Sequence, residues 1–415
     1  MSTIIKNPVD LGSVAGNLSI LSESFVNAVA MRGQLAAMTV RSVGVEEELL
    51  LVAPDSGRPL AVAESALRAA SQAGSGQTAD EDHLDSGEGG PGLELQFELQ
   101  RQQLETSTRP CRSLSELRAE LGRGRSLAAG AAAKAGARVA ALATSPVPVE
   151  PALVRKGRYL MMAQAYGLTA HEQLTCGCHV HVGVSSPEEG IGVLDRIRPW
   201  LPVLLAVSAN SPYWQGQDTG YASYRYQAWS RWPTAGPTDA FGTVEAYQRT
   251  IREMVGTGTL LDSGMVYFDA RLSEHYPTIE IRIADVCLRA DDAVLVAALV
   301  RALVETEARA WQAGDGVSGH RVEMLRLASW RASRSGLEHS LLSPVTGLPE
   351  SAPVTANALF DHVRDALDEG GDAATTRELL DAVLARGNGA AFQRAAFEAD
   401  GAAAMIGRAA DITAG

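Results

Sequence analysis

The chain has little of what several large classes of protein depend on. It has four cysteines in 415 residues, too few for a disulfide framework, so we expect a reducing, cytoplasmic setting. Only 36 basic residues stand against 49 acidic ones, which gives a formal net charge of -13. A surface that binds nucleic acid or an anionic membrane needs a basic patch, so we expect neither partner. Small molecules are the partners that this composition favours.

Long apolar runs are also missing. No stretch approaches the roughly 20 uninterrupted apolar residues that a membrane-spanning helix requires. The opening residues, MSTIIKNPVD, lack the basic start and apolar core of a signal peptide, so we interpret residues 1–38 as an N-terminal extension that is helical or mobile. Hydrophobic residues make up 46% of the chain, and no linker or repeat interrupts it. We therefore predict one domain over residues 39–415.

Helix-like periodicity and strand-like alternation interleave along the chain. The periodicity predicts helices over residues 61–73, 113–135, 187–208, 243–255, 291–313 and 322–332, and the Ala-rich segment from residue 352 onward is predicted to be helical as well. The alternation predicts strands over residues 42–52, 93–100, 137–143, 176–184 and 278–286. Long mixed connections separate these strands, which favours an α+β fold with a mostly antiparallel sheet and helices on one side.

Four of the predicted strands have one apolar face and one polar face. Because side chains alternate across a strand, Glu46 and Glu48 share a face of residues 42–52, while Glu47 lies on the apolar side, where we expect it to pair with an Arg or Lys. The other three strands repeat the design with the polar residues Glu94, Gln96, Glu98 and Gln100; His179 and His181; and Glu280 and Arg282. An ordinary exposed face would mix Lys, Thr and Arg instead of gathering Glu and His.

Clustered carboxylates in a core predict a compensating cation. Unpaired buried carboxylates are costly, and Glu46, Glu48, Glu98, Glu280 and one imidazole form an oxygen-rich set that suits Mg²⁺ or Mn²⁺. Side chains two apart on a strand are rooted about 6.5 to 7 Å apart, so they can converge on metal ions spaced about 3.5 to 4 Å. We expect such a pair of ions to handle a triphosphate.

A zinc site is the alternative for the segment CGCHVH. It would take Cys176, Cys178, His179 and His181 as ligands. On a regular strand the two cysteines point away from the two histidines, so this site requires a bulge. We expect the cysteines to be small apolar residues of the core.

Five segments, taken in order, resemble the carboxylate-amine ligase family known as glutamate-cysteine ligase type 2, a branch of the glutamine synthetase-like superfamily. They are VGVEEELLLV, ELQRQQLETSTRPC, CGCHVHVG, RPWLPVLLAVSANSPYWQGQDTGYASYR and YFDARLSEHYPTIEIRIAD. The resemblance covers the chain from about Thr39 to the region of Asp400. It implies a curved, mostly antiparallel sheet that forms a funnel, with helices packed on its outer face. ATP would enter one end, an amino-acid carboxylate the other, and Mg²⁺ would lie between them; a homodimer is also expected.

The resemblance also implies roles for particular residues. Arginines that hold phosphate or substrate carboxylate would be Arg271 and Arg282, which act on the reacting groups, and Arg225, which joins Arg282 at the nucleotide. The metal ligands would be Glu46, Glu48, Glu98, Glu105, His179 and Glu280. Glu98 and Glu105 are seven residues apart and lie on opposite faces of a straight strand, so a bulge or turn near residues 101–103 must redirect the chain if both bind metal.

The implied reaction is ATP-dependent amide formation, with glutamate and cysteine or another amine as substrates. The γ-phosphoryl group would pass to the substrate carboxylate to give an acyl phosphate, which the amine then attacks. No protein nucleophile is needed. The alternative is a metal-dependent amide hydrolase that uses the same Glu and His face to activate water. We expect Trp200, Trp214, Trp229 and Trp232 to be packing residues, in a segment aromatic enough to wall a ligand site.

Overall fold

The computed structural model describes residues 40–72 and 94–415. Within these ranges, Arg41–Gly415 form one compact unit. The predicted extension at residues 1–38 lies outside the described residues, as does Leu93 at the start of one predicted strand. None of the described helices has the length and apolar character needed to span a membrane.

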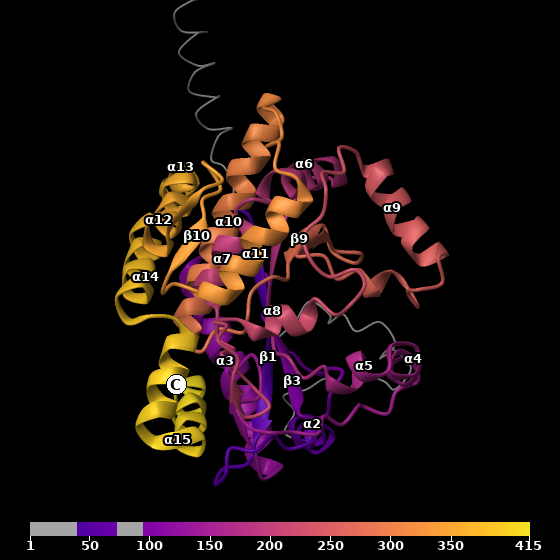
Figure 1. The fold of residues 1–415 in the computed structure, drawn as a ribbon, viewed down its shortest axis with the longest axis vertical. Helices are drawn as coiled ribbons and strands as arrows, with labels where there is room; N and C mark the ends of the chain where they lie inside the picture. Colours follow the sequence, from indigo (N-terminus) through magenta and orange to yellow (C-terminus); the bar gives the residue numbers. More distant parts are fainter. Residues whose placement is uncertain (1–39, 73–93) are drawn as a thin grey trace, which may run out of the picture. The chain divides into compact units, whose positions relative to one another are not determined.

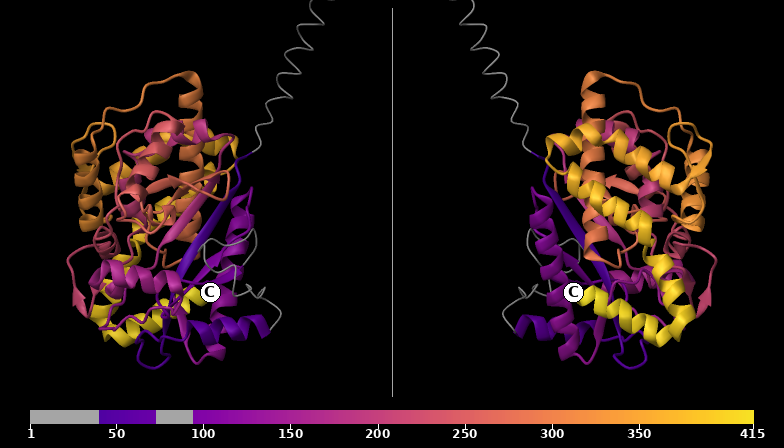
Figure 2. Two further views of the ribbon diagram at one scale, coloured as in Figure 1. Left: turned by 90° about the vertical axis from the view of Figure 1, so that its right-hand side faces the viewer. Right: turned by 90° about the vertical axis from the view of Figure 1, so that its left-hand side faces the viewer.

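The main sheet of the described residues has seven strands, and every pairing in it is antiparallel. Its central strand, β1 (Val43–Val52), crosses the unit as a long diagonal (Figure 2). The order is β2-β3-β1-β5-β9-β8, and β4 pairs with the far end of β1. The bounds of these strands are β2 Glu94–Phe97, β3 Gln103–Ser107, β4 Arg138–Ala140, β5 Cys178–Gly183, β8 Ala270–Leu272 and β9 Thr278–Ile281.

Each of the five predicted strands contains an observed one, so the mostly antiparallel α+β fold is confirmed. Strands β3 and β8 were not predicted, because they are short and lack a clean apolar alternation. Two small hairpins were also missed. They pair β6 (Tyr213–Trp214) with β7 (Gln217–Asp218), and β10 (Ser340–Leu342) with β11 (Pro349–Ser351).

Two long helices cover the apolar face of the sheet (Figure 1). Helix α3 (Leu114–Lys134) is capped at its N-terminus by Ser113. The Ser113 side chain accepts a hydrogen bond from the backbone N–H of Glu116, and the Glu116 carboxylate accepts one from the backbone N–H of Ser113. Helix α10 (Ala290–Ala313) packs on β1 and β5 and is buried over most of its length, because other helices cover its outer side. Val45, Val180 and Ile281 form part of the core beneath these helices. The apolar faces predicted from alternation therefore face helices.

The remaining helices surround this core. The prediction of one helix over residues 187–208 was wrong: α6 (Pro187–Ile197) and α7 (Leu201–Ser208) are separate, and Pro199 and Pro202 supply no backbone N–H to continue the first helix. The Ala-rich C-terminal segment is helical as predicted. The other bounds are α2 Ala63–Gln72, α11 Val322–Ser335, α12 Ala352–His362, α13 Arg364–Glu369, α14 Ala373–Arg386 and α15 Gly389–Ala414.

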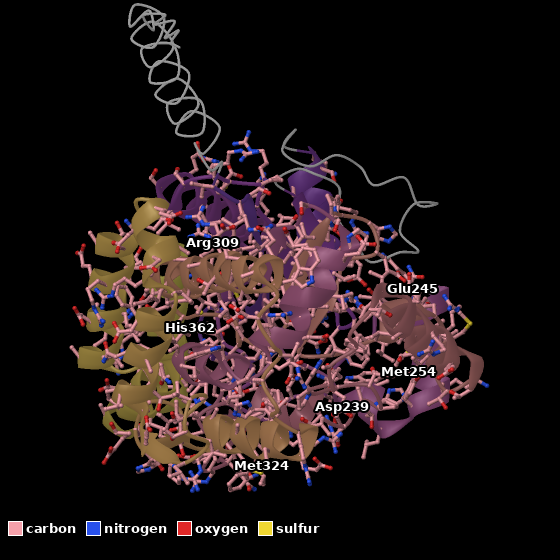
Figure 3. The ribbon with its side chains drawn as sticks, turned by 90° about the horizontal axis from the view of Figure 1, so that it is seen from above. Asp239, Glu245, Met254, Arg309, Met324 and His362 are labelled. Carbon is pink, nitrogen blue, oxygen red and sulfur yellow. The ribbon has the colours of Figure 1, made fainter. Side chains whose placement is uncertain are left out.

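The polar face of the sheet is bordered by shorter elements. These are α4 (Gly157–Tyr166), α5 (Leu168–Glu172), α8 (Tyr224–Trp229), α9 (Val244–Gly256) and a short 3₁₀ helix, η1 (Ser263–Met265). Glu245 and Met254, near the two ends of α9, lie at one edge of the unit, whereas His362 of α12 lies toward the opposite side (Figure 3). A cavity opens on this polar face, and α4, α8 and η1 contribute to its walls.

Candidate active site

Six ligand-type side chains from neighbouring strands meet on the polar face of the sheet. Cross-strand pairing explains their meeting: Glu48 of β1 lies opposite Glu105 of β3, and Glu46 lies opposite His179 of β5. On the next strand, Glu280 of β9 lies opposite His181. Two groups result, each with ligand atoms within 4.8 Å of one another: Glu46, His179 and Glu280, and Glu48, Glu98 and Glu105.

A hairpin brings Glu98 and Glu105 together. Strand β2 ends at Phe97, the chain turns at residues 101–102, and β3 returns antiparallel to β2. The turn that was predicted as a condition for Glu98 and Glu105 to share a site is therefore present. Glu98 lies just beyond β2, where its carboxylate accepts a hydrogen bond of 2.5 Å from the backbone N–H of Leu99.

The group at Glu46 is linked by short contacts. His179 Nδ1 lies 3.3 Å from Glu46 Oε2 and 4.0 Å from Glu280 Oε1. His181 Nε2 lies 3.4 Å from Glu46 Oε1, so the second imidazole also lines the site. Among the described residues, Nε2 of His179 and Nε2 of His181 are buried without a hydrogen-bond partner of acceptable geometry. Imidazole nitrogens that have no hydrogen-bond partner and lie beside carboxylates are suited to bind a metal ion.

Burial and charge perturb the ionisation of both groups. Burial opposes ionisation of Glu46, but His181 and His179 outweigh it and hold the pKa of Glu46 well below its usual range. Burial and then the charge of Arg282 lower the pKa of His179 to about 4, which keeps its imidazole neutral. Burial and then the charge of Glu48 raise the pKa of Glu98 to about 8. Burial and neighbouring carboxylates likewise raise the pKa of Glu105 well above its ordinary value.

These groups satisfy the chemistry of a divalent-cation site. Three carboxylates that repel one another in a buried place ionise together only when a cation compensates them. A neutral imidazole is the protonation state that binds metal. The donor sets, three carboxylates in one group and two carboxylates with an imidazole in the other, suit Mg²⁺ or Mn²⁺.

Two predicted arginines lie beside the first group. Arg271 Nε donates to Glu280 Oε2 at 2.6 Å, and Arg282 donates to Glu280 Oε1. Burial opposes the charge of Glu280, but the two guanidinium groups hold its pKa well below the ordinary value. Both arginines line the cavity. Positive charge is thus fixed at the edge of the carboxylate cluster.

The third predicted arginine, Arg225 of α8, is buried on the same side of the sheet as His179. Its guanidinium is buried, donates to the backbone oxygens of Ile283 and Arg282, and lies 3.9 Å from Asp285. It is not among the residues that line the cavity. A Cβ on Gly177 would lie 2.3 Å from Arg225 Nη2 and 2.9 Å from His179 Nε2, so glycine at 177 permits their close approach. The nucleotide-binding role of Arg225 stays a prediction.

The cavity has a volume of about 990 Å³, including the open space at its mouth. Beyond the carboxylates, its wall is aromatic and contains Tyr159, Trp229, Trp232 and Tyr267. Trp229 and Trp232, which we expected to be packing residues, thus also line the site, whereas Trp200 stacks on His362 at 4.3 Å between ring centroids. Three further lining residues were not predicted, because they lie outside the strands, where no alternation marks a polar face: Arg158 and Tyr159 of α4, and Gln173 directly after α5.

Residues on the opposite face of β1 and β5 have structural roles. Glu47 forms a buried ion pair with Arg125 of α3 at 2.6 Å, as predicted for a carboxylate on the apolar side. All four cysteines are free and buried. Cys178 lies in the hydrophobic core, on the side of β5 away from His179 and His181. The regular pleat therefore excludes the zinc alternative.

Two solved structures have a similar fold at low sequence identity. A glutamate-cysteine ligase from Francisella tularensis, solved in complex with AMP, aligns with a TM-score of 0.64 at 13% identity, over 91% of this chain and 88% of that one. A bifunctional glutathione synthetase from Pasteurella multocida aligns with a TM-score of 0.62 at 15% identity, over 93% of this chain and 54% of that one. At these identities the similarity shows a shared fold.

Sequence similarity shows the family to which the chain belongs. Residues 42–405 match the model of glutamate-cysteine ligase family 2, and the chain belongs to this family. A protein of Streptomyces avermitilis named "Putative glutamate--cysteine ligase 2-1" is 51% identical over 362 residues, which cover 87% of this chain and 96% of that protein. A Streptomyces coelicolor protein named "Putative glutamate--cysteine ligase 2" is 50% identical over 355 residues, covering 86% of this chain and 94% of that protein. The chain is accordingly an enzyme of the ligase type.

Proposed function

We propose that the protein is an ATP- and Mg²⁺-dependent carboxylate-amine ligase that joins glutamate to cysteine or another amine through an acyl phosphate. The observation that carries this proposal is the pair of adjacent ligand groups on one face of the sheet, with Arg271 and Arg282 beside them. Triphosphate chemistry needs this combination, because charge must be neutralised on both the transferred group and the leaving group.

The metal-holding roles follow from the two groups. Glu46, His179 and Glu280 would hold one ion, and Glu48, Glu98 and Glu105 would hold a second. When bound, Mg²⁺ supplies charge neutralisation at the phosphate oxygens and fixes the orientation of the triphosphate.

The chain's own residues position the reactants. Arg282 and Arg271 are held by Glu280, so their guanidinium groups stay at one edge of the cavity, where they would contact phosphate or substrate carboxylate. Gly177 donates its backbone N–H to Glu48 Oε2 at 2.6 Å, which orients that carboxylate. Groups fixed in this geometry lower the barrier to reaction, because they need not be reoriented when the reactants meet.

The bonds of the proposed reaction balance without a protein nucleophile. A carboxylate oxygen of the acid attacks the γ-phosphorus, the bond to the β,γ-bridging oxygen breaks, and ADP leaves with the electron pair. The amine nitrogen then attacks the acyl carbon, the carbon–oxygen bond to phosphate breaks, and the nitrogen releases a proton. The four buried cysteines take no part. Family membership disfavours the amide hydrolase alternative.

A coupled assay tests the proposal. The full chain is incubated with MgCl₂, ATP and L-glutamate, or with other amino-acid carboxylates, in the presence of hydroxylamine. We expect ADP and a hydroxamate to form together, and a chelator to abolish both. Absence of ADP with every acid, or amide cleavage without nucleotide, would contradict the proposal. We further propose a cytoplasmic location, in keeping with four unpaired cysteines, and a homodimer, which sedimentation would test.

A further inference from the structure

Asp285 is a buried carboxylate that lies outside the cavity, in the segment that follows β9. The residue is 0% exposed and does not line the cavity. Its carboxylate accepts hydrogen bonds from the backbone N–H of Asn210 at 2.8 Å, from the Ser211 hydroxyl at 2.7 Å and from the Ser223 hydroxyl at 2.8 Å. A buried carboxylate destabilises a protein unless its partners compensate it. The partners of Asp285 therefore indicate its role.

Two serine hydroxyls connect Asp285 to the first turn of α8. The Ser223 side chain caps this helix and accepts a hydrogen bond from the backbone N–H of Tyr226 at 3.4 Å. The Ser211 hydroxyl accepts one from the backbone N–H of Arg225 at 3.0 Å. A hydroxyl has a single proton, and each serine donates it to Asp285, so the hydroxyl oxygen is oriented to accept from the helix. Asp285 thereby fixes the position of the first turn of α8.

Arg225, in this first turn, makes only long hydrogen bonds with its side chain. Arg225 is 2% exposed, and its guanidinium donates to the backbone oxygens of Ile283 and Arg282 at 3.4 and 3.3 Å. Its Nε is buried without a hydrogen-bond partner among the described residues. Asp285 supplies a compensating negative charge, 3.9 Å from Nη1. Because charges interact strongly in a buried place, Asp285 stabilises the guanidinium at this position.

The guanidinium of Arg225 lies beside a predicted metal ligand. A Cβ on Gly177 would be 2.3 Å from Arg225 Nη2 and 2.9 Å from His179 Nε2, so these two nitrogens border the same small space. At the other end of the imidazole, Nδ1 of His179 lies 3.3 Å from Glu46 Oε2. The guanidinium therefore limits rotation of the imidazole away from Glu46.

The location of Arg225 favours positioning over direct contact with a substrate. Arg271 and Arg282 line the cavity, whereas Arg225 does not. A phosphate or carboxylate oxygen in the cavity would therefore meet those two guanidinium groups. Helix α8 reaches the cavity through Trp229, whose ring centroid lies 5.8 Å from the Arg225 Cζ. Arg225 thus links Asp285 to residues of the site without entering the cavity.

We propose that Asp285 is a positioning residue, which places Arg225 against His179 and so holds Glu46, His179 and Glu280 in a geometry that binds a divalent cation. Without the Asp285 charge, the Arg225 guanidinium is uncompensated and the two serine hydroxyls lose their acceptor. The imidazole then moves more freely, and the affinity of this group for a cation falls before any nucleotide binds. This inference rests on the proposed ligase function and extends it to residues outside the cavity.

Titration of Mn²⁺ into the metal-free protein without nucleotide, followed by electron paramagnetic resonance of the free ion, tests this role. Asp285→Asn removes the charge at nearly constant volume and should weaken at least one Mn²⁺ site by about tenfold, the scale typical of groups that orient a metal ligand. A variant that combines Ser211→Ala with Ser223→Ala keeps the Asp285 charge and should weaken the same site by a smaller factor.

The matched control is Asp195→Asn. Asp195 is also buried, at 2% exposed, and lies outside the cavity. Its carboxylate accepts hydrogen bonds from the backbone N–H groups of Phe241 and Gly242, both at 2.7 Å. This substitution removes a buried charge of the same kind at a place that has no contact with α8, so the affinity for Mn²⁺ should stay that of the parent.

A double variant separates positioning from a general loss of structure. Because Asp285 is proposed to act through Arg225, Arg225→Met should weaken the same Mn²⁺ site, and Asp285→Asn should add less than about a twofold effect in that background. Independent effects would multiply instead. Thermal denaturation of each variant shows whether it folds, and the serine variant gives the same comparison if Asp285→Asn does not fold.

Separate outcomes distinguish this inference from the proposed function. A parent that binds no Mn²⁺, with or without a non-hydrolysable ATP analogue, refutes the proposed function. Equal Mn²⁺ affinity in the parent and in Asp285→Asn, or in the serine variant if Asp285→Asn does not fold, refutes the inference alone. Weakening that appears only with the analogue also refutes it, because Arg225 would then contact the nucleotide. Equal weakening in Asp195→Asn, or effects that multiply in the double variant, would refute the positioning role as well.

Discussion

The buried ion pair between Glu47 and Arg125 gives the sharpest prediction about stability. Glu47 is fully buried on the back of the strand that carries Glu46 and Glu48, and Arg125 is 2% exposed. The guanidinium donates two hydrogen bonds to the carboxylate, at 2.9 and 2.6 Å, and two more to the backbone oxygens of Leu288 and Cys287. Glu47→Met would leave a buried cation with only the two backbone acceptors.

The expected cost follows from the loss of one partner of a buried pair. Leaving the other charge uncompensated destabilises a protein by about 3 to 5 kcal/mol. Because apolar replacement of a whole buried pair is often neutral, the double variant Glu47→Met with Arg125→Met should recover most of the lost stability. The exposed pair between Arg364 and Asp361 is the control, and Asp361→Ala should change stability far less.

Equilibrium unfolding in urea, followed by circular dichroism, measures these differences in the free energy of unfolding. All variants are compared at one pH and without metal. A Glu47→Met variant as stable as the parent would refute the reasoning. So would a double variant that is less stable than either single variant, because the ion pair would then contribute more than the hydrophobic pair that replaces it.

Three further predictions concern the cavity. Glu280→Gln removes a ligand charge without changing volume and should abolish ADP formation while the circular dichroism spectrum stays that of the parent; activity near the parent level would contradict its role. Arg225→Ala should act more mildly, raising the KM for ATP or for the acid in steady-state kinetics, and unchanged kinetics would leave this arginine a structural residue only. Metal-free stability should depend on pH through Glu98 and Glu105, whose pKa values are raised in the folded chain. A raised pKa contributes stability that is complete below the ordinary value, about 4.5, and that is lost as pH rises through about 8 for Glu98. The melting temperature without metal should therefore fall over this range, Mg²⁺ should restore it, and Glu98→Gln should flatten part of the slope; a melting temperature that rises with pH would refute the assignment.

The strand pattern predicted the main features of the site, for a physical reason. A strand between a helical layer and a cavity must alternate, so Glu46 and Glu48 could be assigned to one face and Glu47 to the other from the sequence alone. The same alternation separated Cys178 from His179. These assignments need only the two-residue alternation of side chains along a strand, which is visible in the local sequence.

Other features of the site depend on contacts between segments that are distant in the sequence. Local periodicity does not predict such contacts. Glu105 reaches Glu98 because a hairpin follows Phe97, and the family resemblance rather than the pattern pointed to it. Gln173 reaches the cavity from a short connection after α5, where no alternation distinguishes it from a surface residue. In the predicted helix over residues 187–208, Pro199 already marked the break between α6 and α7, but the apolar periodicity outweighed it.

The proposed function requires the acidic face of the sheet to hold divalent cations together with a nucleotide. Titration of Mn²⁺ into the metal-free protein with a non-hydrolysable ATP analogue, followed by electron paramagnetic resonance of the free ion, counts bound ions directly. We expect at least two ions for each chain, and at least one fewer in both Glu280→Gln and Glu48→Gln. A parent that takes up no Mn²⁺ in the presence of the analogue, or variants that bind as many ions as the parent, would contradict the account.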